Sequence, residues 1–300
     1  MKKSVRYCVA GHRFDVYAEN LVAVCDCLPS YEPFRIETRD DEEVLFSVYL
    51  CREMEVFGTV VERFKWEGAS CVAYRDEEEV LLLEIAPEET ERLYVMKMYP
   101  GFQRMEVTVY DDSADTFVLN SCLMLAFVYA TASMHTLLMH ASVVRTKENG
   151  YLFLGKSGTG KSTHSQLWLH CLAGVELLND DNPVVRLVNG TPWVYGAPWS
   201  GKTPCYRNEG VEVGALLQLY QSPVNRIKPL SAVEGLASLM GSASLVRWDG
   251  KGYADNMDTL MALVSEVSVY RLDCLPDVEA ARMAYETCVY GRKGQVDCSQ

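Results

Sequence analysis

The chain has 300 residues, of which 49% are hydrophobic and 23% charged. This is the balance of a soluble globular protein and excludes a disordered or collagen-like chain, and the length suffices for two ordinary domains. The formal net charge is −13, with acidic runs at residues 40–43, 76–79 and 88–91. An acidic field repels nucleic acid and anionic membranes, so we expect neither as a partner.

The 11 cysteines are scattered and contain no Cys-x-x-Cys pair. A disulfide framework or a zinc site would need a more regular spacing. We therefore expect free thiols in a cytoplasmic protein. The first residues carry two lysines but no apolar run behind them, so they do not resemble a signal peptide.

The first 115 residues alternate apolar and polar positions in short segments, and turns rich in glycine, proline or acidic residues separate these segments. This pattern predicts an antiparallel β-rich domain over residues 1–115, without a cluster that looks catalytic. The strand segments are 44–50, 79–85, 94–99 and 105–110.

Residues 116–144 contain no Asp, Glu, Lys or Arg, and the segment is long enough to be considered as a membrane span. Polar side chains interrupt it, and Asn120 is a suitable N-cap for a helix that continues to Met139. Because a helix that is apolar on nearly every face is also typical of a protein core, we predict a buried helix. The membrane span is the alternative.

The second domain, residues 116–300, continues with a different pattern that predicts a mixed α/β fold. Residues 141–154 favour a hairpin that leads into the stretch GKSGTGKST at 155–163, and residues 163–172 favour a helix. A short strand at 175–178 ends in Asn-Asp-Asp-Asn at 179–182. Asn189-Gly190 is a strong signal for a second hairpin.

The glycine-rich stretch fits the phosphate-binding pattern G-x-x-x-x-G-K-[ST]. Glycines let backbone N–H groups approach phosphate oxygens, and the following helix adds its positive N-terminal end. Lys161 is expected to reach the β and γ phosphates, and the Ser162 hydroxyl to bind Mg²⁺. We therefore expect ATP and Mg²⁺ as cofactors. The expected nucleotide-binding residues are Gly155, Lys156, Ser157, Gly158, Thr159, Gly160, Lys161, Ser162 and Thr163.

Phosphoryl transfer also needs a carboxylate beside the metal and a residue that orients or deprotonates the acceptor. Asp180 and Asp181 follow a strand one helix after the loop, and neighbouring residues of an extended chain point to opposite sides. One aspartate can therefore face the metal and the other the acceptor. The alternative is a polar turn without catalytic function.

Three further side chains are candidates for this site. His140 lies directly before the hairpin that leads into the loop, where a histidine is either catalytic or structural. Lys202 and Arg207 lie in a stretch rich in glycine and proline that could form a mobile lid or only a solvated loop. A cation there could neutralise charge on the transferring phosphoryl group.

His140, GKSGTGKS at 155–162 and Asp180-Asp181, in this order and spacing, resemble the catalytic domain of the HPr kinase/phosphorylase family and its relatives. That family is akin to the nucleotide site of phosphoenolpyruvate carboxykinase. The C-terminal segments LLQLYQSPVNRIKPLSAVEGLASL and VYRLDCLPDVEAARMAYE are similar to the same family. The resemblance covers residues 135–290 and implies a P-loop kinase-like catalytic domain after the β-rich domain.

The resemblance implies roles for the matched residues. Asp180 would be the base, with His140 beside it, and Asp181 would lie on the metal side with Ser162, although the residues alone leave the order of the two aspartates open. Lys161 and the loop glycines would bind the phosphates of the nucleotide. The family also allows a homo-oligomer.

The family signature Glu-Ile-Arg-Gly-x-Gly is absent, and the corresponding residues 194–202 read VYGAPWSGK. The resemblance therefore does not extend to HPr as the acceptor or to the reverse phosphorylase reaction. The sequence predicts an ATP-dependent kinase for a hydroxyl of a protein or peptide serine or of a small metabolite. A non-catalytic nucleotide-binding scaffold with the same fold is the alternative, and a guanine-selective Asn-Lys-x-Asp motif of a switch NTPase is absent.

Overall fold

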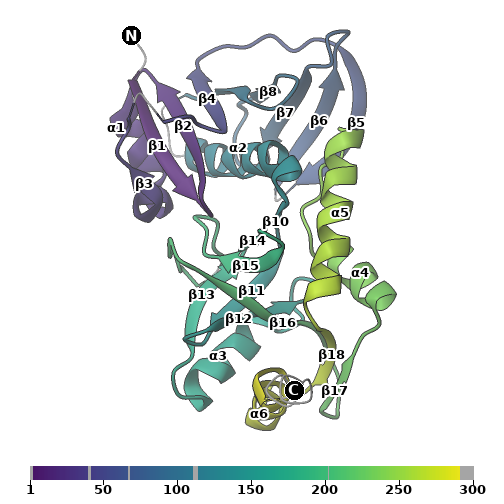
Figure 1. Ribbon diagram of the computed structural model, residues 1–300. Helices are drawn as coiled ribbons and strands as arrows, with labels where there is room; N and C mark the ends of the chain where they lie inside the picture. The colour runs from purple at the N-terminus through teal and green to yellow at the C-terminus, as the bar shows by residue number, and fades with distance from the viewer. Residues whose placement is uncertain (1–2, 40–41, 67, 111–113, 202, 291–300) are drawn as a thin grey trace. The chain divides into compact units, whose positions relative to one another are not determined.

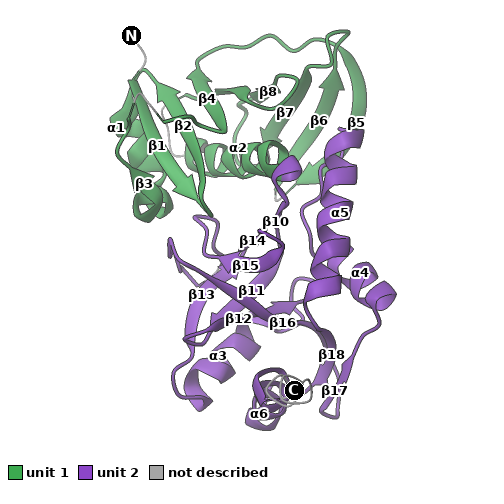
Figure 2. Cartoon of the chain, viewed as in Figure 1, with its two compact units in different colours: residues 1–131 green, residues 132–300 purple. Residues whose placement is uncertain are grey.

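The computed structural model describes residues 3–39, 42–66, 68–110, 114–201 and 203–290 (Figure 1). The chain divides into two compact units, residues 1–131 and residues 132–300 (Figure 2). Both units are mixed α and β structures, and each is built on a large mixed sheet.

The sheet of unit 1 has the strand order β3-β1-β2-β4-β9-β8-β7-β6-β5. The predicted antiparallel sheet is wrong in one respect, because β4 lies parallel to both of its neighbours, β2 and β9. Parallel neighbours need long connections, and the chain supplies them through helix α1 (Leu21–Cys27) and the 3₁₀ turn η1 (Pro29–Phe34) on one side of β4 and through β5 to β8 on the other. The strands are β1 (Lys3–Val9), β2 (His12–Ala18), β3 (Arg35–Ile36), β4 (Phe46–Cys51), β5 (Thr59–Trp66), β6 (Ala69–Arg75), β7 (Leu81–Pro87), β8 (Tyr94–Met98) and β9 (Arg104–Thr108).

Helix α2 (Ala114–Thr131) contains most of the long apolar segment and packs on β4, β8 and β9. The window from Asp115 to Met134 is long and apolar enough to cross a membrane, but 61% of it is buried inside the protein. Such burial is typical of the core helix of a soluble protein. Because α2 packs on these strands, it is grouped with unit 1, whereas the sequence pattern placed it in the second domain.

The helix bounds differ from the prediction. The helix begins before Asn120, which is not its N-cap, and it ends at Thr131 rather than at Met139. The 3₁₀ turn η2 (Ala132–Met134) follows, and His135 takes a positive φ of 50°, which no helix residue can adopt. The next residues form β10 (Thr136–Leu138), which pairs with β14 (Val184–Val188) and cannot remain helical.

The sheet of unit 2 has the order β10-β14-β15-β16-β12-β11-β13, and β18 pairs with β16 and β17. Its strands β12, β16 and β18 are parallel to one another, while β11 is antiparallel to β12 and β13. The predicted hairpin at Asn189-Gly190 is present between β14 and β15, and both turn residues have positive φ. The further strands are β11 (Ala141–Arg145), β12 (Asn149–Leu154), β13 (Glu176–Asp181), β15 (Thr191–Tyr195), β16 (Gly210–Gln221), β17 (Arg226–Pro229) and β18 (Val269–Cys274).

Helices cover both faces of this sheet. Successive residues of its central strands point to opposite faces, and the residues on both faces are apolar. In β12, Leu152 and Leu154 belong to one core, which also contains Leu239 and Leu260 of α4 and α5. The neighbouring residues of β12 belong to the core under α3 and α6. The side chains of each central strand thus alternate between the two cores, as the period of two along a strand requires. The helices are α3 (Lys161–Cys171), α4 (Ala232–Met240), α5 (Gly250–Glu266) and α6 (Val278–Tyr285), and a π-helical turn η3 (Glu286–Tyr290) follows α6.

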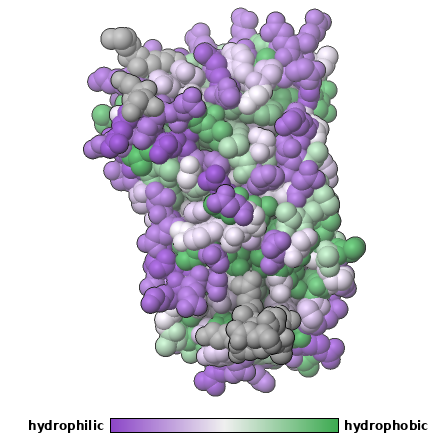
Figure 3. Space-filling model, in the orientation of Figure 1, coloured by the Kyte–Doolittle hydropathy of each residue, from purple (hydrophilic) through white to green (hydrophobic). Residues whose placement is uncertain are grey.

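The surface carries many polar side chains. Figure 3 shows hydrophilic residues interspersed with smaller hydrophobic patches on the visible face. In the acidic run at 76–79, Glu77, Glu78 and Glu79 are all exposed. Solvation of these carboxylates lets the chain keep its large negative charge on a folded surface.

Trp168 of α3 fixes this helix on the sheet and provides a test of the packing. The side chain is fully buried and contacts the rings of Tyr151, Phe153 and Tyr285. Trp168→Ala should lower the free energy of unfolding by about 3–5 kcal/mol, because it leaves a cavity under the helix. Urea unfolding followed by circular dichroism measures the change.

Tyr253→Ala is the matched control, since Tyr253 is an aromatic residue of α5 with an exposed side chain. We expect a change within about 0.5 kcal/mol there. Equal effects of the two substitutions would contradict the assigned packing of α3.

Candidate functional site

The glycine-rich loop joins the end of β12 to the start of α3, in the predicted order of strand, loop and helix. Gly155, Gly158 and Gly160 have φ angles of 149°, 81° and 102°, which L-residues rarely adopt. A Cβ atom on Gly155 would lie 2.5 Å from Oγ1 of Thr159. The shape of the loop therefore requires glycine at these positions.

Lys161 is the first residue of α3, and its side chain turns back under the loop. The Nζ atom lies 2.9 Å from the Gly155 carbonyl oxygen and 2.8 Å from Nε2 of His140. Burial lowers the pKa of the Lys161 ammonium, and the negative charges of Asp181 and Asp180 oppose this shift. The loop thus encloses a desolvated cation whose charge is compensated from β13.

His140 connects this lysine to Asp181. Its Nδ1 atom lies 3.0 Å from Oδ1 of Asp181, and both side chains are about one-third exposed, at 38% and 34%. A lysine ammonium can only donate, so Nε2 of His140 accepts, and the ring proton lies on Nδ1 facing the carboxylate. The backbone N–H of His140 donates to the Ser242 carbonyl at 2.6 Å, which fixes the residue between β10 and β11.

Asp180 has a different partner from its neighbour in sequence. It is buried, with 3% of its surface exposed, and its Oδ1 atom accepts a hydrogen bond of 2.9 Å from the Ser162 hydroxyl. The two aspartates therefore divide as the alternation along a strand predicts. One carboxylate lies beside Ser162 and the other beside His140.

Two asparagines hold the end of β13 in this conformation. Asn179 is fully buried, donates to the Ala197 carbonyl at 3.2 Å and accepts from the backbone N–H of Asn182 at 3.1 Å. The Asn182 amide donates to Oδ2 of Asp181 at 3.0 Å. The sequence reasoning missed both positioning roles, although the run Asn-Asp-Asp-Asn itself was the signal.

The backbone of Asp181 takes a φ of 123°, in a region that only glycine visits readily. Ser200 and Gly201 pack against this point: the Ser200 hydroxyl donates to the Asp180 carbonyl at 3.0 Å, and the Gly201 backbone N–H also donates to that carbonyl. A Cβ atom on Gly201 would lie 3.0 Å from the Asp181 Cβ. Strain of this kind persists only where the surroundings impose it, and it is common at functional sites.

Buried polar residues hold the first turns of α3 on the sheet. The hydroxyls of Ser165 and Ser142 lie 2.7 Å apart, and the His164 ring packs edge-on against Phe153. Only 2% of the His164 surface is exposed, and burial lowers the pKa of this imidazole to about 4. His164 is therefore neutral at physiological pH.

The remaining predicted residues lie near Lys161 and the two aspartates or fall outside the residues that the structure describes. Lys156, Ser157 and Thr163 are exposed, and the Thr159 hydroxyl donates to the Lys156 carbonyl at 2.7 Å. Lys202, the predicted lid cation, lies outside the described residues. Arg207, the other cation of that stretch, instead pairs with Glu176 at 2.7 Å.

The oxygen atoms of Ser162 and Asp180 fit a magnesium ion, which prefers hard oxygen ligands. Within the described part of the chain, no group of three or more His, Cys, Asp or Glu side chains could hold a metal ion. A magnesium ion at this point would thus depend on phosphate oxygens and water for most of its ligands, as is usual in nucleotide sites.

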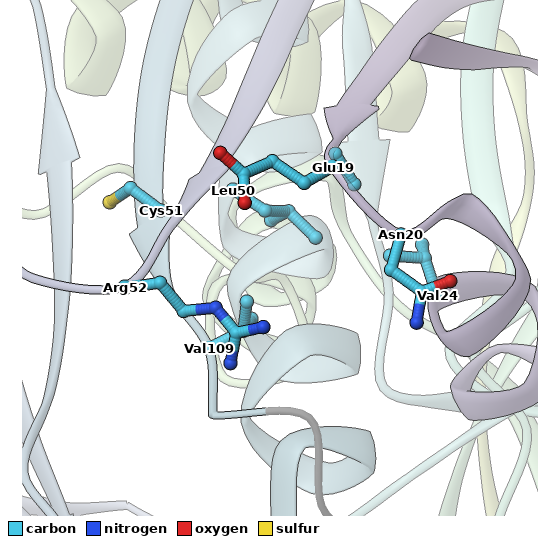
Figure 4. A pocket seen from close by; sticks show the side chains of 8 residues that line it. Glu19, Asn20, Val24, Leu50, Cys51, Arg52 and Val109 are labelled. Atoms are coloured by element: carbon cyan, nitrogen blue, oxygen red, sulfur yellow. The ribbon is translucent and has the colours of Figure 1, made fainter. Parts of the chain in front are cut away.

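Another hollow, of about 230 Å³, lies in unit 1 and is lined by Glu19, Asn20, Cys51 and Arg52, among others (Figure 4). Its lining contains one exposed carboxylate, Glu19, and one exposed guanidinium, Arg52.

No protein-family model matches the sequence, and no curated protein matches it. Among solved structures, the HPr(Ser) kinase/phosphatase from Coxiella burnetii is similar to this chain, with 14% sequence identity over 53% of this chain and 98% of that chain. The TM-score of 0.30 indicates a distant relationship at most. A function for this chain therefore has to rest on the residues of the site.

The strain at Asp181 predicts an unusual order of stability. Asp181→Gly and Asp181→Ala both remove the carboxylate, but only glycine accommodates the positive φ. We expect the glycine variant to be more stable than the alanine variant by about 1–3 kcal/mol in urea unfolding. The control is Asp258, an exposed residue inside α5, where alanine should be the more stable by about 1 kcal/mol. If the alanine variant were more stable than the glycine variant at position 181 as well, the backbone of Asp181 would not be strained.

The buried His164 predicts a loss of stability in acid. In the unfolded chain the imidazole binds a proton below about pH 6.5, whereas in the folded protein its pKa is about 4. The unfolded state is therefore increasingly favoured as the pH falls from 6.5 to 4. The residue should remove about 3 kcal/mol of stability over that range. His164→Phe should flatten the profile between these limits, whereas His170→Phe, at an exposed position of the same helix, should leave it unchanged. A profile that His164→Phe does not alter would contradict the buried neutral state.

Proposed function

We propose that this protein is an ATP-dependent kinase that transfers the γ-phosphoryl group to a hydroxyl. The observation that carries the proposal is the pair of side-chain contacts where the loop enters α3. His140 links Lys161 to Asp181, and Ser162 donates a hydrogen bond to Asp180. These are the types of group that phosphoryl transfer needs: a cation, a hydroxyl and carboxylate for the metal, and a base.

The phosphates of ATP would bind in the loop, where backbone N–H groups and the N-terminal end of α3 favour an anion. Without a ligand, Nζ of Lys161 is satisfied by the Gly155 carbonyl and by His140. A phosphate oxygen is a stronger acceptor for an ammonium group than either of these neutral partners. Lys161 thus has a reason to exchange a neutral partner for the β or γ phosphate on binding.

Ser162 and Asp180 would hold magnesium, which would neutralise charge on the β and γ phosphates. The hydrogen bond between them keeps both oxygens at one point before any ligand binds. Asp180 is buried, so its carboxylate is poorly placed to meet an acceptor from solvent. These contacts favour Asp180 as the metal-side residue, although the family resemblance gave it the role of base.

Asp181 would then be the base. Its carboxylate is accessible, and His140 and Asn182 hold its two oxygens. The acceptor hydroxyl gives its proton to this carboxylate while its oxygen bonds to the γ phosphorus, and the bond from that phosphorus to the bridging oxygen of ADP breaks. Lys161 compensates charge on the phosphate oxygens during this step.

The acceptor would approach from the side on which Asp181 and His140 are exposed. A serine of a protein or peptide and a hydroxyl of a small metabolite both meet the chemical requirement of the base. We further propose a cytoplasmic location, where ATP and free thiols occur together, and a homo-oligomer is compatible with the site, since its described residues all come from one chain.

Phosphate release from ATP in the absence of an acceptor tests the proposal. Lys161→Ala should reduce turnover by about 100-fold or more, because it removes the ammonium group that the loop encloses. Asp180→Asn should raise the Mg²⁺ concentration required for half-maximal activity. Asp181→Asn should lower turnover at saturating Mg²⁺ and leave the affinity for ATP nearly unchanged.

Lys251→Ala and Asp258→Asn are the controls, since both residues are exposed on α5. They should retain wild-type turnover. If Lys161→Ala and Asp181→Asn also retain it, the site is assigned wrongly. If the wild-type protein binds ATP but neither hydrolyses it nor phosphorylates any acceptor, the non-catalytic scaffold is the better description.

A further inference from the structure

A hollow of about 710 Å³ lies on the other side of the glycine loop from the catalytic residues. One wall is the loop and the first turn of α3, from Gly158 to Gly160 with Thr163 and His164. The opposite wall is formed by described residues at or after the ends of β16 and β18: Leu219, Gln221, Ser222 and Pro223, and Cys274, Leu275 and Pro276. His140, Lys161, Ser162, Asp180 and Asp181 do not line it.

The position of this hollow in the sheet is that of a ligand site. Strands β12, β16 and β18 are parallel neighbours, and the residues that line the hollow lie at the carboxyl ends of β16 and β18 and in the loop that follows β12. In open α/β sheets, ligands bind beyond the carboxyl ends of parallel strands. The glycine loop thus borders both this hollow and the group of catalytic residues, and one ligand can contact both.

The chemistry of the two spaces differs. The catalytic side holds a lysine, two aspartates and a histidine, whereas none of the described residues that line the hollow is charged. Leu219, Pro223, Leu275 and Pro276 supply apolar surface. Such a wall suits an uncharged, partly apolar group rather than a phosphate.

His164 supplies an independent indication of a ligand site. Its side chain is almost completely buried, and its Nε2 atom has no hydrogen-bond partner among the residues that the structure describes. A buried polar atom without a partner costs free energy, so such atoms are rare unless a ligand or water satisfies them. Because this imidazole is neutral, it matches a neutral heterocycle or hydroxyl.

The edge of the hollow is connected to the loop itself. The Gln221 side chain, at the end of β16, donates to the Gly158 carbonyl at 3.2 Å. A ligand that occupies the hollow therefore lies against the same residues that fix the conformation of the phosphate-binding stretch.

We propose that this hollow binds the nucleoside part, base and ribose, of the nucleotide whose phosphates the loop binds. This rests on the proposed function, since the loop must hold the phosphates for the nucleoside to reach the hollow. The phosphates lie on the charged side of the loop, the chain of the nucleotide passes Thr163, and the base enters the uncharged side next to His164.

Calorimetric titration with two ligands tests this assignment: ATP, and inorganic tripolyphosphate as the phosphate chain without a nucleoside, each with Mg²⁺. The wild-type protein should bind ATP at least about tenfold more tightly than tripolyphosphate. Ser222→Trp, which fills the hollow, and His164→Phe, which removes the ring nitrogens, should each weaken ATP binding by about tenfold or more and change tripolyphosphate binding by less than about twofold. Circular dichroism confirms that each variant is folded.

Ser265→Trp, at an exposed position of α5, is the matched control and should alter neither affinity. Equal wild-type affinities for the two ligands, or unchanged ATP binding by both hollow variants, would overturn the nucleoside assignment and leave the phosphate site intact. Binding of neither ligand, or binding of both that Lys161→Ala does not affect, would instead contradict the proposed function. Photolabelling with 8-azido-ATP gives a second readout and should modify peptides that carry His164 or Ser222.

Discussion

A buried lysine ammonium is the constraint on which the site of unit 2 depends. Nζ of Lys161 lies under the glycine loop, where its desolvation costs several kcal/mol unless acceptors and negative charge surround it. The Gly155 carbonyl and His140 supply the acceptors, and the two aspartates of β13 supply the charge. Three segments that are distant in sequence must therefore meet at one point for the loop to close. The central strands are buried on both faces, and this rigid sheet is what holds the three segments together.

The same constraint explains why two neighbouring carboxylates have separate tasks. The buried Asp180 accepts a hydrogen bond from Ser162, whereas Asp181, whose backbone has a positive φ, contacts His140 with a partly exposed carboxylate. The backbone N–H of Asn182 donates to the Asn179 side chain, and the Asn182 amide donates to Asp181, so these hydrogen bonds join the run Asn-Asp-Asp-Asn at 179–182 into one unit. The placement of the Asp181 carboxylate thus reduces the stability of the fold.

Much of this could be predicted from the sequence, because its signals are local. The glycine pattern at 155–162, the hairpin at Asn189-Gly190 and the segments of period two each depend on a few neighbouring residues. The end of α2 and the parallel position of β4 could not be predicted, because strand pairing with distant segments decides them. Alternation along the strand predicted that the two aspartates would face different partners, but the partner of each one could not be predicted, because His140 and Ser162 come from distant segments. His164 carries no sequence signal that separates it from a core histidine.

The distribution of charge around the loop sets the direction in which a nucleotide can lie. Charged groups gather on the side of β13, and the described wall toward β16 and β18 has none. A ligand with an anionic end and a neutral end has only one favourable orientation between them, since the reverse would desolvate phosphates against leucine and proline and leave Lys161 without an anion. In the proposed kinase the γ phosphate would thereby lie beside the exposed carboxylate of Asp181, and this carboxylate would not distinguish one acceptor hydroxyl from another. Selection of the acceptor must then come from surface beyond this carboxylate, and the chemistry at the loop can remain the same whatever hydroxyl is presented to it.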